Sequence, residues 1–181
     1  MNGESATPNI FPRIAALAIT GTVVFGPMYG PMTASAEDLF AGPATVIDGR
    51  TLEVQGQRLR LTGIDAPDLG QPCAWPNKQI DCGNVSRTAL LDLVAVGEVR
   101  CTATATATAA TAVTAVTTGF RPARCQSGGF DVAANMVHTG WAVTAPDGPP
   151  GYRATEAKAR AGKRGLWKGQ FEMPWIWRRR Q

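Results

Sequence analysis

Alternation of apolar and polar residues predicts three short β-strands in the first half of the chain. The first is the apolar run Ala44–Ile47, which ends at the turn signal Asp48-Gly49. Thr51–Val54 alternates, Gln55-Gly56-Gln57 supplies a second turn, and Arg58–Ile64 alternates again as R-L-R-L-T-G-I. Alternating runs separated by glycine-containing turns are typical of strands joined by hairpins.

Helical periodicity appears later in the chain. Apolar residues at helical spacing predict helices over Asn84–Val96, Asp131–Trp141 and Tyr152–Lys163. Pro146–Gly151 predicts a linker between the last two helices. Gly70–Cys82 contains two prolines and no periodicity, so we expect it to be a loop.

A further strand is predicted from Val99, and it runs into the low-complexity segment 102–118, TATATATAATAVTAVTT. Strict Thr/Ala alternation predicts a strand pair with a turn near Ala109-Ala110, where the phase slips. A solvated irregular excursion is the alternative, because alanine buries little surface.

The resulting order is three strands, a helix, two strands and two helices. This order predicts an α+β domain, a five-stranded OB-type β-barrel with three helices packed against it. Barrels of this type bind oligonucleotides and sugars on one face. A length of 181 residues, 44% of them hydrophobic, allows one compact domain with its own core. His138 is the single histidine of the chain, which excludes a two-histidine metal site.

Residues 1–36 are predicted to be a secretory signal peptide. The uncharged run IAALAITGTVVFGPM follows Arg13, and the small-x-small sequence Ala34-Ser35-Ala36 precedes the acidic Glu37-Asp38. We expect cleavage near Ala36, a domain over 37–181, and a secreted or periplasmic monomer without a stable membrane span. A buried helix and an uncleaved anchor are the alternative interpretations.

Charge is distributed unevenly over the expected domain. Residues 37–120 hold 6 basic and 9 acidic side chains, whereas residues 121–181 hold 11 and 4. This asymmetry predicts an anionic partner, although runs of charge are also typical of a solvated face. In the basic aromatic tail 166–181 the tryptophans could stack on bases, but we expect them to cover the barrel. Arg178-Arg179-Arg180 is expected to be a solvated end.

The chain has four cysteines, and export would place them where disulfides persist. Of the three connectivities we favour Cys73–Cys82, which clips a proline-rich segment, together with Cys101–Cys125, which ties two neighbouring segments. Zinc binding by all four is not favoured, because the cysteine pairs lack the short spacing of zinc sites.

The segments VIDGRTLEV and RLRLTGIDAPD, with the ending GYRATEAKARAGKRGLWKG, resemble the staphylococcal nuclease family. The resemblance spans roughly residues 43–177 and implies an OB-type barrel. It also implies Ca²⁺-assisted hydrolysis of phosphodiesters in DNA and RNA. In such a site two aspartates and a carbonyl hold Ca²⁺, a glutamate handles the attacking water, and two arginines clamp the phosphate.

Several positions of this chain match the family pattern. Arg60 corresponds to the first phosphate arginine, Asp65 to a metal aspartate, and Asp48 to the first aspartate of the D-G-D turn. Ala66 can supply the carbonyl. These matches predict Arg60 and Asp68 as catalytic candidates and Asp65 and Asp48 as metal ligands.

Other positions depart from the pattern. Arg50 stands where the second metal aspartate of D-G-D belongs, and Asp68 is one methylene shorter than the glutamate it replaces. Phe120 occupies the position of the second arginine, with Arg121 one residue away and therefore on the opposite strand face unless a bulge intervenes. The family's tyrosines are missing near Ala142–Pro146.

These departures predict that Ca²⁺ binds weakly or not at all, because Arg50 removes carboxylate ligands and can pair with Asp65. We therefore expect an exported protein that binds nucleic acid or another polyanion through Arg50, Arg60 and Arg121, with weak or no hydrolysis. The alternatives are a Ca²⁺-dependent phosphodiesterase with a rearranged metal site, and a structural domain that uses the barrel for protein contacts. Asp65 and Arg60 could also form only a structural ion pair, and Asp68 could only cap a turn.

Overall fold

The structure is a computed structural model that describes residues 3, 38–104 and 119–181. The predicted signal peptide, except for residue 3, and most of the Thr/Ala segment, residues 105–118, lie outside the described residues. The signal peptide and the strand pair expected in the Thr/Ala segment therefore stay predictions.

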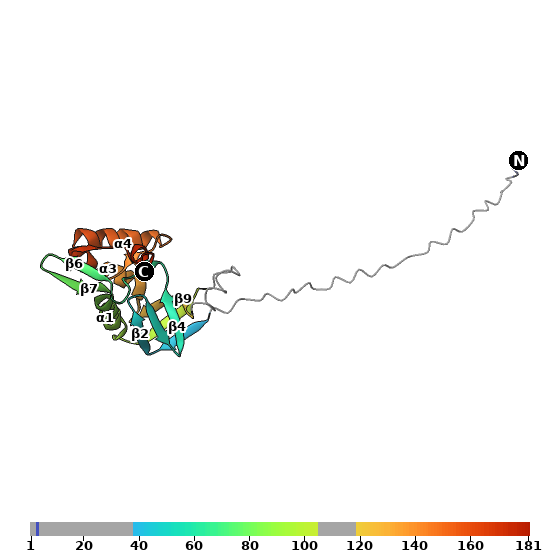
Figure 1. Cartoon of the computed structure of the whole chain (residues 1–181). Coiled ribbons are helices and arrows are strands. Elements are labelled where there is room, and N and C mark those ends of the chain that lie inside the picture. The colour runs from blue at the N-terminus through green and yellow to red at the C-terminus, as the bar shows by residue number, and fades with distance from the viewer. Residues whose placement is uncertain (1–2, 4–37, 105–118) are drawn as a thin grey trace. The chain divides into compact units, whose positions relative to one another are not determined.

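A curled mixed sheet forms the centre of the domain (Figure 1). Its strand order is β1-β8-β9-β4-β3-β2, with β10 paired to β9. Among the described strands of this sheet only β4 and β9 run parallel. The strands are β1 (Leu39–Gly42), β2 (Ala44–Asp48), β3 (Thr51–Val54), β4 (Gln57–Leu61), β8 (Val99–Ala103), β9 (Arg121–Ser127) and β10 (Phe130–Asp131). These strands confirm the predicted α+β class of the OB-type fold.

The sheet curls because the bent stretch 39–48 pairs with a different strand at each of its two ends. β1 and β2 are separated only by Pro43, yet β1 pairs with β8 and β2 pairs with β3. Gly42 has φ of 150°, a conformation that glycine adopts readily, at this bend. The sequence pattern does not predict β1, since Leu39–Gly42 shows no alternation.

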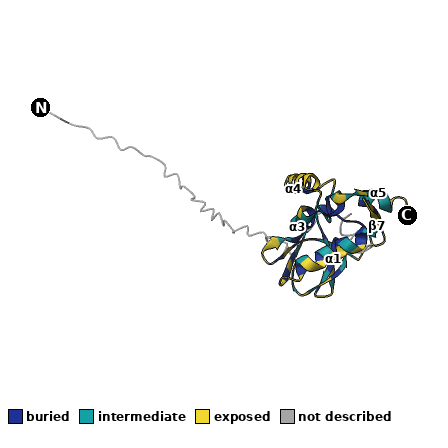
Figure 2. Ribbon diagram, turned by 90° about the vertical axis from the view of Figure 1, so that its left-hand side faces the viewer, coloured by how far each residue is buried: buried dark blue, intermediate teal, exposed yellow. Residues whose placement is uncertain are grey.

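In the described part of the chain three helices pack around the sheet, as predicted, and a short fourth helix lies near the C-terminus. They are α1 (Cys82–Val94), α3 (Val132–Thr139), α4 (Pro150–Ala161) and α5 (Pro174–Arg178), with the 3-10 turn η1 (Gly165–Lys168) between the last two. Asp81 and Asp131 cap the first two helices by accepting hydrogen bonds from the backbone N–H groups of Asn84 and Ala134. Figure 2 shows that α1 has one buried and one exposed face.

The core lies between the sheet and α1 and α3. Leu52, Leu59, Leu90, Met136 and Val137 are completely buried there. Among the described residues, no helix is long and apolar enough to cross a membrane.

The prediction of a loop over Gly70–Cys82 is wrong, because this segment contains a hairpin. β6 (Pro72–Trp75) and β7 (Lys78–Asp81) pair around the turn Pro76-Asn77, and β12 (Gln170–Phe171) adds a third strand. Pro72 is tolerated because it is the first strand residue. Leu166 is buried against this sheet, and the tail aromatics that pack around it are Trp167, Phe171 and Trp175.

Both predicted disulfides, Cys73–Cys82 and Cys101–Cys125, are present. Cys101 and Cys125 are directly opposite each other in the β8–β9 ladder, with Cα atoms 4.0 Å apart. Cys73–Cys82 joins β6 to the first residue of α1.

Tyr152 should ionise only when the domain unfolds in alkali. Its hydroxyl donates to Asp131 Oδ2 at 2.6 Å, and burial together with this carboxylate raises the pKa of Tyr152 well above its ordinary value of 10.0. The folded state therefore favours the protonated phenol. This contribution to stability is fully present below pH 10.0 and is lost progressively as the pH rises above it.

The measurement is the phenolate absorbance of a Tyr29→Phe variant, in which Tyr152 is the remaining tyrosine. The absorbance should rise together with the loss of the circular dichroism signal. Ionisation near the ordinary pKa with the dichroism unchanged would contradict this expectation.

Candidate functional site

Asp65 and Asp68 lie on and just after a short buried strand. β5 (Ile64–Asp65) pairs with β11 (Val143–Thr144), which holds Asp65 at 5% exposure. Asp65 Oδ1 accepts a hydrogen bond from the backbone N–H of Ala66 at 2.9 Å. The two carboxylates therefore come from a segment with a fixed backbone.

Arg50 reaches the same place from the turn between β2 and β3. Asp48 Oδ1 accepts a hydrogen bond from the backbone N–H of Arg50 at 2.9 Å, as in an Asx turn. The Leu61 N–H donates to the Arg50 carbonyl at 2.9 Å, so this turn is also tied to β4. Asp48 thus shapes the turn that directs Arg50.

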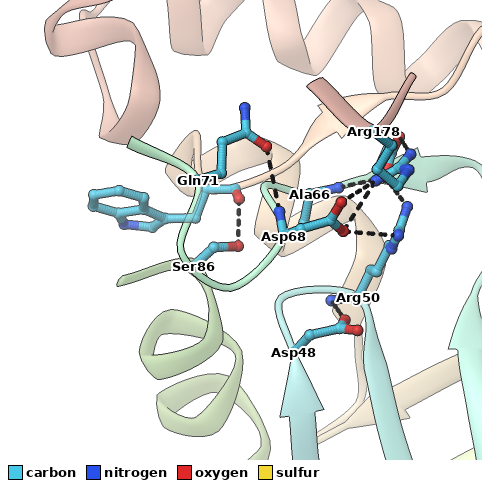
Figure 3. A network of polar contacts seen from close by, with 9 residues as sticks. Asp48, Arg50, Ala66, Asp68, Gln71, Ser86 and Arg178 are labelled. Atoms are coloured by element: carbon cyan, nitrogen blue, oxygen red, sulfur yellow. Dashed lines mark hydrogen bonds and ion pairs between the residues drawn. The ribbon is translucent and has the colours of Figure 1, made fainter. Parts of the chain in front are cut away.

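Two arginines and two aspartates form a closed network (Figure 3). Arg50 is paired with Asp65 through Nη1, and its Nη2 lies 3.1 Å from Asp68 Oδ1. Arg178 is paired with Asp65 through Nη2, and its Nη1 lies 3.1 Å from Asp68 Oδ1 and 3.3 Å from Asp68 Oδ2. Every oxygen of the two carboxylates accepts a hydrogen bond from an arginine.

The participation of Arg178 corrects the expectation of a solvated C-terminal end. Arg178 is the last residue of α5 and lies 113 positions from Asp65 in the sequence. Burial alone would lower the pKa of Arg178, but the hydrogen bond to Asp65 and the charges of both aspartates outweigh burial and raise it. A triple arginine has no periodicity or spacing from which this contact could be predicted.

Arg60 lies beside the network without entering it. Its guanidinium carbon is 4.4 Å from the centre of the Phe120 ring, a cation–π contact. Burial, and next the positive charge of Arg50, lower the pKa of Arg60. Its Nε is buried and has no hydrogen-bond partner in the part of the chain that the structure describes. The predicted replacement of an arginine by Phe120 therefore places an aromatic ring against Arg60.

Arg121 is placed elsewhere. Its register partner in the parallel β4–β9 pair is Leu59, which is in the core, whereas Arg60 faces Pro122. The Arg121 side chain pairs with Asp38 and lies over Phe40 at 5.4 Å. The structure thus brings together Arg50, Asp65 and Asp68 with Arg60 beside them, while Arg121 contacts β1.

Gln71 anchors the loop that carries Asp68. This fully buried side chain accepts from the Asp68 N–H at 3.3 Å and donates to the Glu172 carbonyl at 2.7 Å, two residues before α5. Gly83 of α1 approaches so closely that an added Cβ would lie 1.9 Å from the Asp68 carbonyl oxygen. The loop is therefore fixed between α1 and the C-terminal segment.

The residues present do not fit a Ca²⁺ ion. Calcium requires six or more oxygen ligands, several of them carboxylates. Here the oxygens of Asp65 and Asp68 are already engaged by two cations, and Asp48 bonds a backbone N–H group. The described residues contain no group of three His, Cys, Asp or Glu side chains that could hold a metal ion.

The fold is that of an OB-fold protein of the nuclease type. It combines a curled sheet and peripheral helices with a charged cluster on the β2–β3 turn and β5. The family model described as staphylococcal nuclease homologue matches residues 58–169. The chain belongs to this family. It is also similar to the succinoglycan biosynthesis protein ExoI of Rhizobium meliloti (strain 1021), with 30% identity over an alignment 188 residues long. The alignment covers 94% of this chain and 81% of that protein.

Proposed function

We propose that this chain binds single-stranded nucleic acid, or another polyanion, without efficient hydrolysis of phosphodiesters. The observation that carries the proposal is the engagement of every Asp65 and Asp68 oxygen by an arginine. A carboxylate held in this way does not accept a proton from water or ligate a cation readily. The family resemblance implies that hydrolysis needs one carboxylate to activate water and another to ligate Ca²⁺.

Arg60 is the group that we propose to contact phosphate. Unlike Arg50 and Arg178, it forms no ion pair among the described residues, and its guanidinium lies beside an aromatic ring. A guanidinium donates hydrogen bonds to phosphate oxygens in a geometry that suits two contacts at once. In this proposal Arg50 adds positive charge near the phosphate and does not contact it directly.

A pocket of about 460 Å³ supports binding of a polymer rather than of an isolated ion. It lies next to β11 and α4, and its lining includes Arg153, Trp175 and Arg160, the last of which pairs with Glu156 of the same pocket. Trp175 and Arg178 are both on α5, so this pocket adjoins the helix that closes the network. Aromatic rings next to cations are the usual platform for single-stranded nucleic acid.

Export is part of the proposal. It is supported by two disulfides, which persist in oxidising compartments. The name of the similar protein refers to the biosynthesis of a glycan, so an acidic polysaccharide is the second polyanion to test.

Arg60→Ala should weaken binding of a labelled single-stranded oligonucleotide by about tenfold, the effect of losing one charge-assisted hydrogen bond. The measurement is fluorescence anisotropy at several salt concentrations between about 50 and 200 mM, where loss of one phosphate contact should also reduce the salt dependence. Arg100→Ala is the matched control, because Arg100 is an exposed strand arginine that pairs with Glu98. It should change the affinity less than twofold.

The same samples decide the question of hydrolysis. The unmodified chain should release no more nucleotide with Ca²⁺ than with a chelator. Strong Ca²⁺-dependent cleavage would disprove the proposal, and so would equal effects of Arg60→Ala and Arg100→Ala. Binding of alginate in preference to the oligonucleotide would assign the site to acidic glycans.

A further inference from the structure

The C-terminal helix contributes half of the positive charge in the network. Arg178 and Arg50 each contact both Asp65 and Asp68, and together they carry two positive charges, the same charge as Ca²⁺. Two fixed guanidinium groups therefore balance the two carboxylates as a divalent cation would. This balance of charge within the site does not depend on what the protein binds.

The position of Arg178 depends on contacts that do not involve Arg50. The segment before α5 is held by the pairing of Phe171 with Cys73 and by the hydrogen bond from Gln71 to the Glu172 carbonyl. Neither contact involves Arg50. Loss of the Arg50 side chain would therefore leave both carboxylates paired with Arg178.

We propose that Arg178 is a positioning residue that closes the Asp65–Asp68 pair, so that the pair accepts a divalent cation only when both arginines are removed. Arg50→Asp by itself restores the carboxylate that the D-G-D pattern contains. It leaves the Arg178 guanidinium paired with the other two carboxylates, those of Asp65 and Asp68. Restoration of the motif alone is thus insufficient, because the competing cation comes from a different part of the chain.

The test uses the full chain and Ca²⁺ alone as the probe, measured by isothermal titration calorimetry at low salt. Arg50→Asp combined with Arg178→Ala should bind one Ca²⁺ with a dissociation constant near the millimolar range of weak natural sites. The unmodified chain, Arg50→Asp and Arg178→Ala should bind at least tenfold more weakly. The matched control is Arg50→Asp combined with Arg180→Ala, since Arg180 is an exposed arginine that pairs with Glu172.

Equal Ca²⁺ affinity of Arg50→Asp with and without Arg178→Ala would overturn the proposal, as would a folded double variant that binds no Ca²⁺. A second measurement applies if the double variant fails to fold. In hydrogen exchange, Arg178→Ala in the otherwise unmodified chain should raise the exchange rate of amides around Asp68 at least fivefold, whereas Arg180→Ala should not. Identical exchange in these two variants would also overturn the proposal.

Discussion

Asp65→Ala should lower the free energy of unfolding by about 3–5 kcal/mol, because it leaves the Arg50 guanidinium buried without its main counter-charge. The side chains of Asp65 and Arg50 are only 7% and 11% exposed, so solvent screens their interaction weakly. The loss should appear as a lower denaturant midpoint with an unchanged m-value.

Asp92→Ala provides the control, since Asp92 is an exposed residue of α1 and its removal should change stability by less than about 0.5 kcal/mol. A combined Arg50→Met and Asp65→Leu variant should be more stable than Asp65→Ala, because apolar residues can replace a buried ion pair with little loss. A change below about 1 kcal/mol for Asp65→Ala would show that Asp68, which also pairs with Arg50, and water compensate for the missing carboxylate.

Removal of the Cys101–Cys125 disulfide by alanine at both positions should lower the free energy of unfolding by about 3 kcal/mol. The bond closes a loop with a sequence separation of 24, and the cross-link restricts the unfolded chain accordingly. Both side chains are also buried in the core, so their truncation removes apolar contacts. Thermal and denaturant unfolding followed by circular dichroism would measure the loss.

Removal of Cys73–Cys82, with a sequence separation of 9, is the comparison and should be milder by about 1 kcal/mol. If it is instead the more damaging change, the contribution of this disulfide is made in the folded state. The reason would be its position between β6 and the start of α1, next to the loop of Asp68.

Most of the barrel was predictable because its information is local. Alternation over Thr51–Val54 and helical spacing over Asn84–Val96 match β3 and α1 closely. The hairpin within Gly70–Cys82 was not predictable, since its strands contain Pro72 and Cys73 and are stabilised by a disulfide and by β12, about 90 residues later. Contacts with distant parts of the chain therefore determine the secondary structure of that segment.

The site divides in the same way. Arg50, Asp65 and Asp68 follow from the motif, and the pairing of Arg50 with Asp65 was anticipated from their charges. Arg178 could not be found, because nothing in a run of three arginines tells which one is folded onto an aspartate. The roles of Arg60 and Arg121 in phosphate binding stay predictions.

The bent stretch β1–β2 has a consequence for how the domain acquires its structure. Leu39 pairs with Thr102, and the parallel pair β4–β9 joins Leu59 to Arg121, so both ladders connect positions about 60 residues apart. Contacts of such high sequence separation require a large loss of chain entropy before the pairing energy of the strands compensates for it. We expect refolding on the millisecond-to-second timescale, with α1 forming early and with the curled sheet completed only after β9 has paired with β4 and β8.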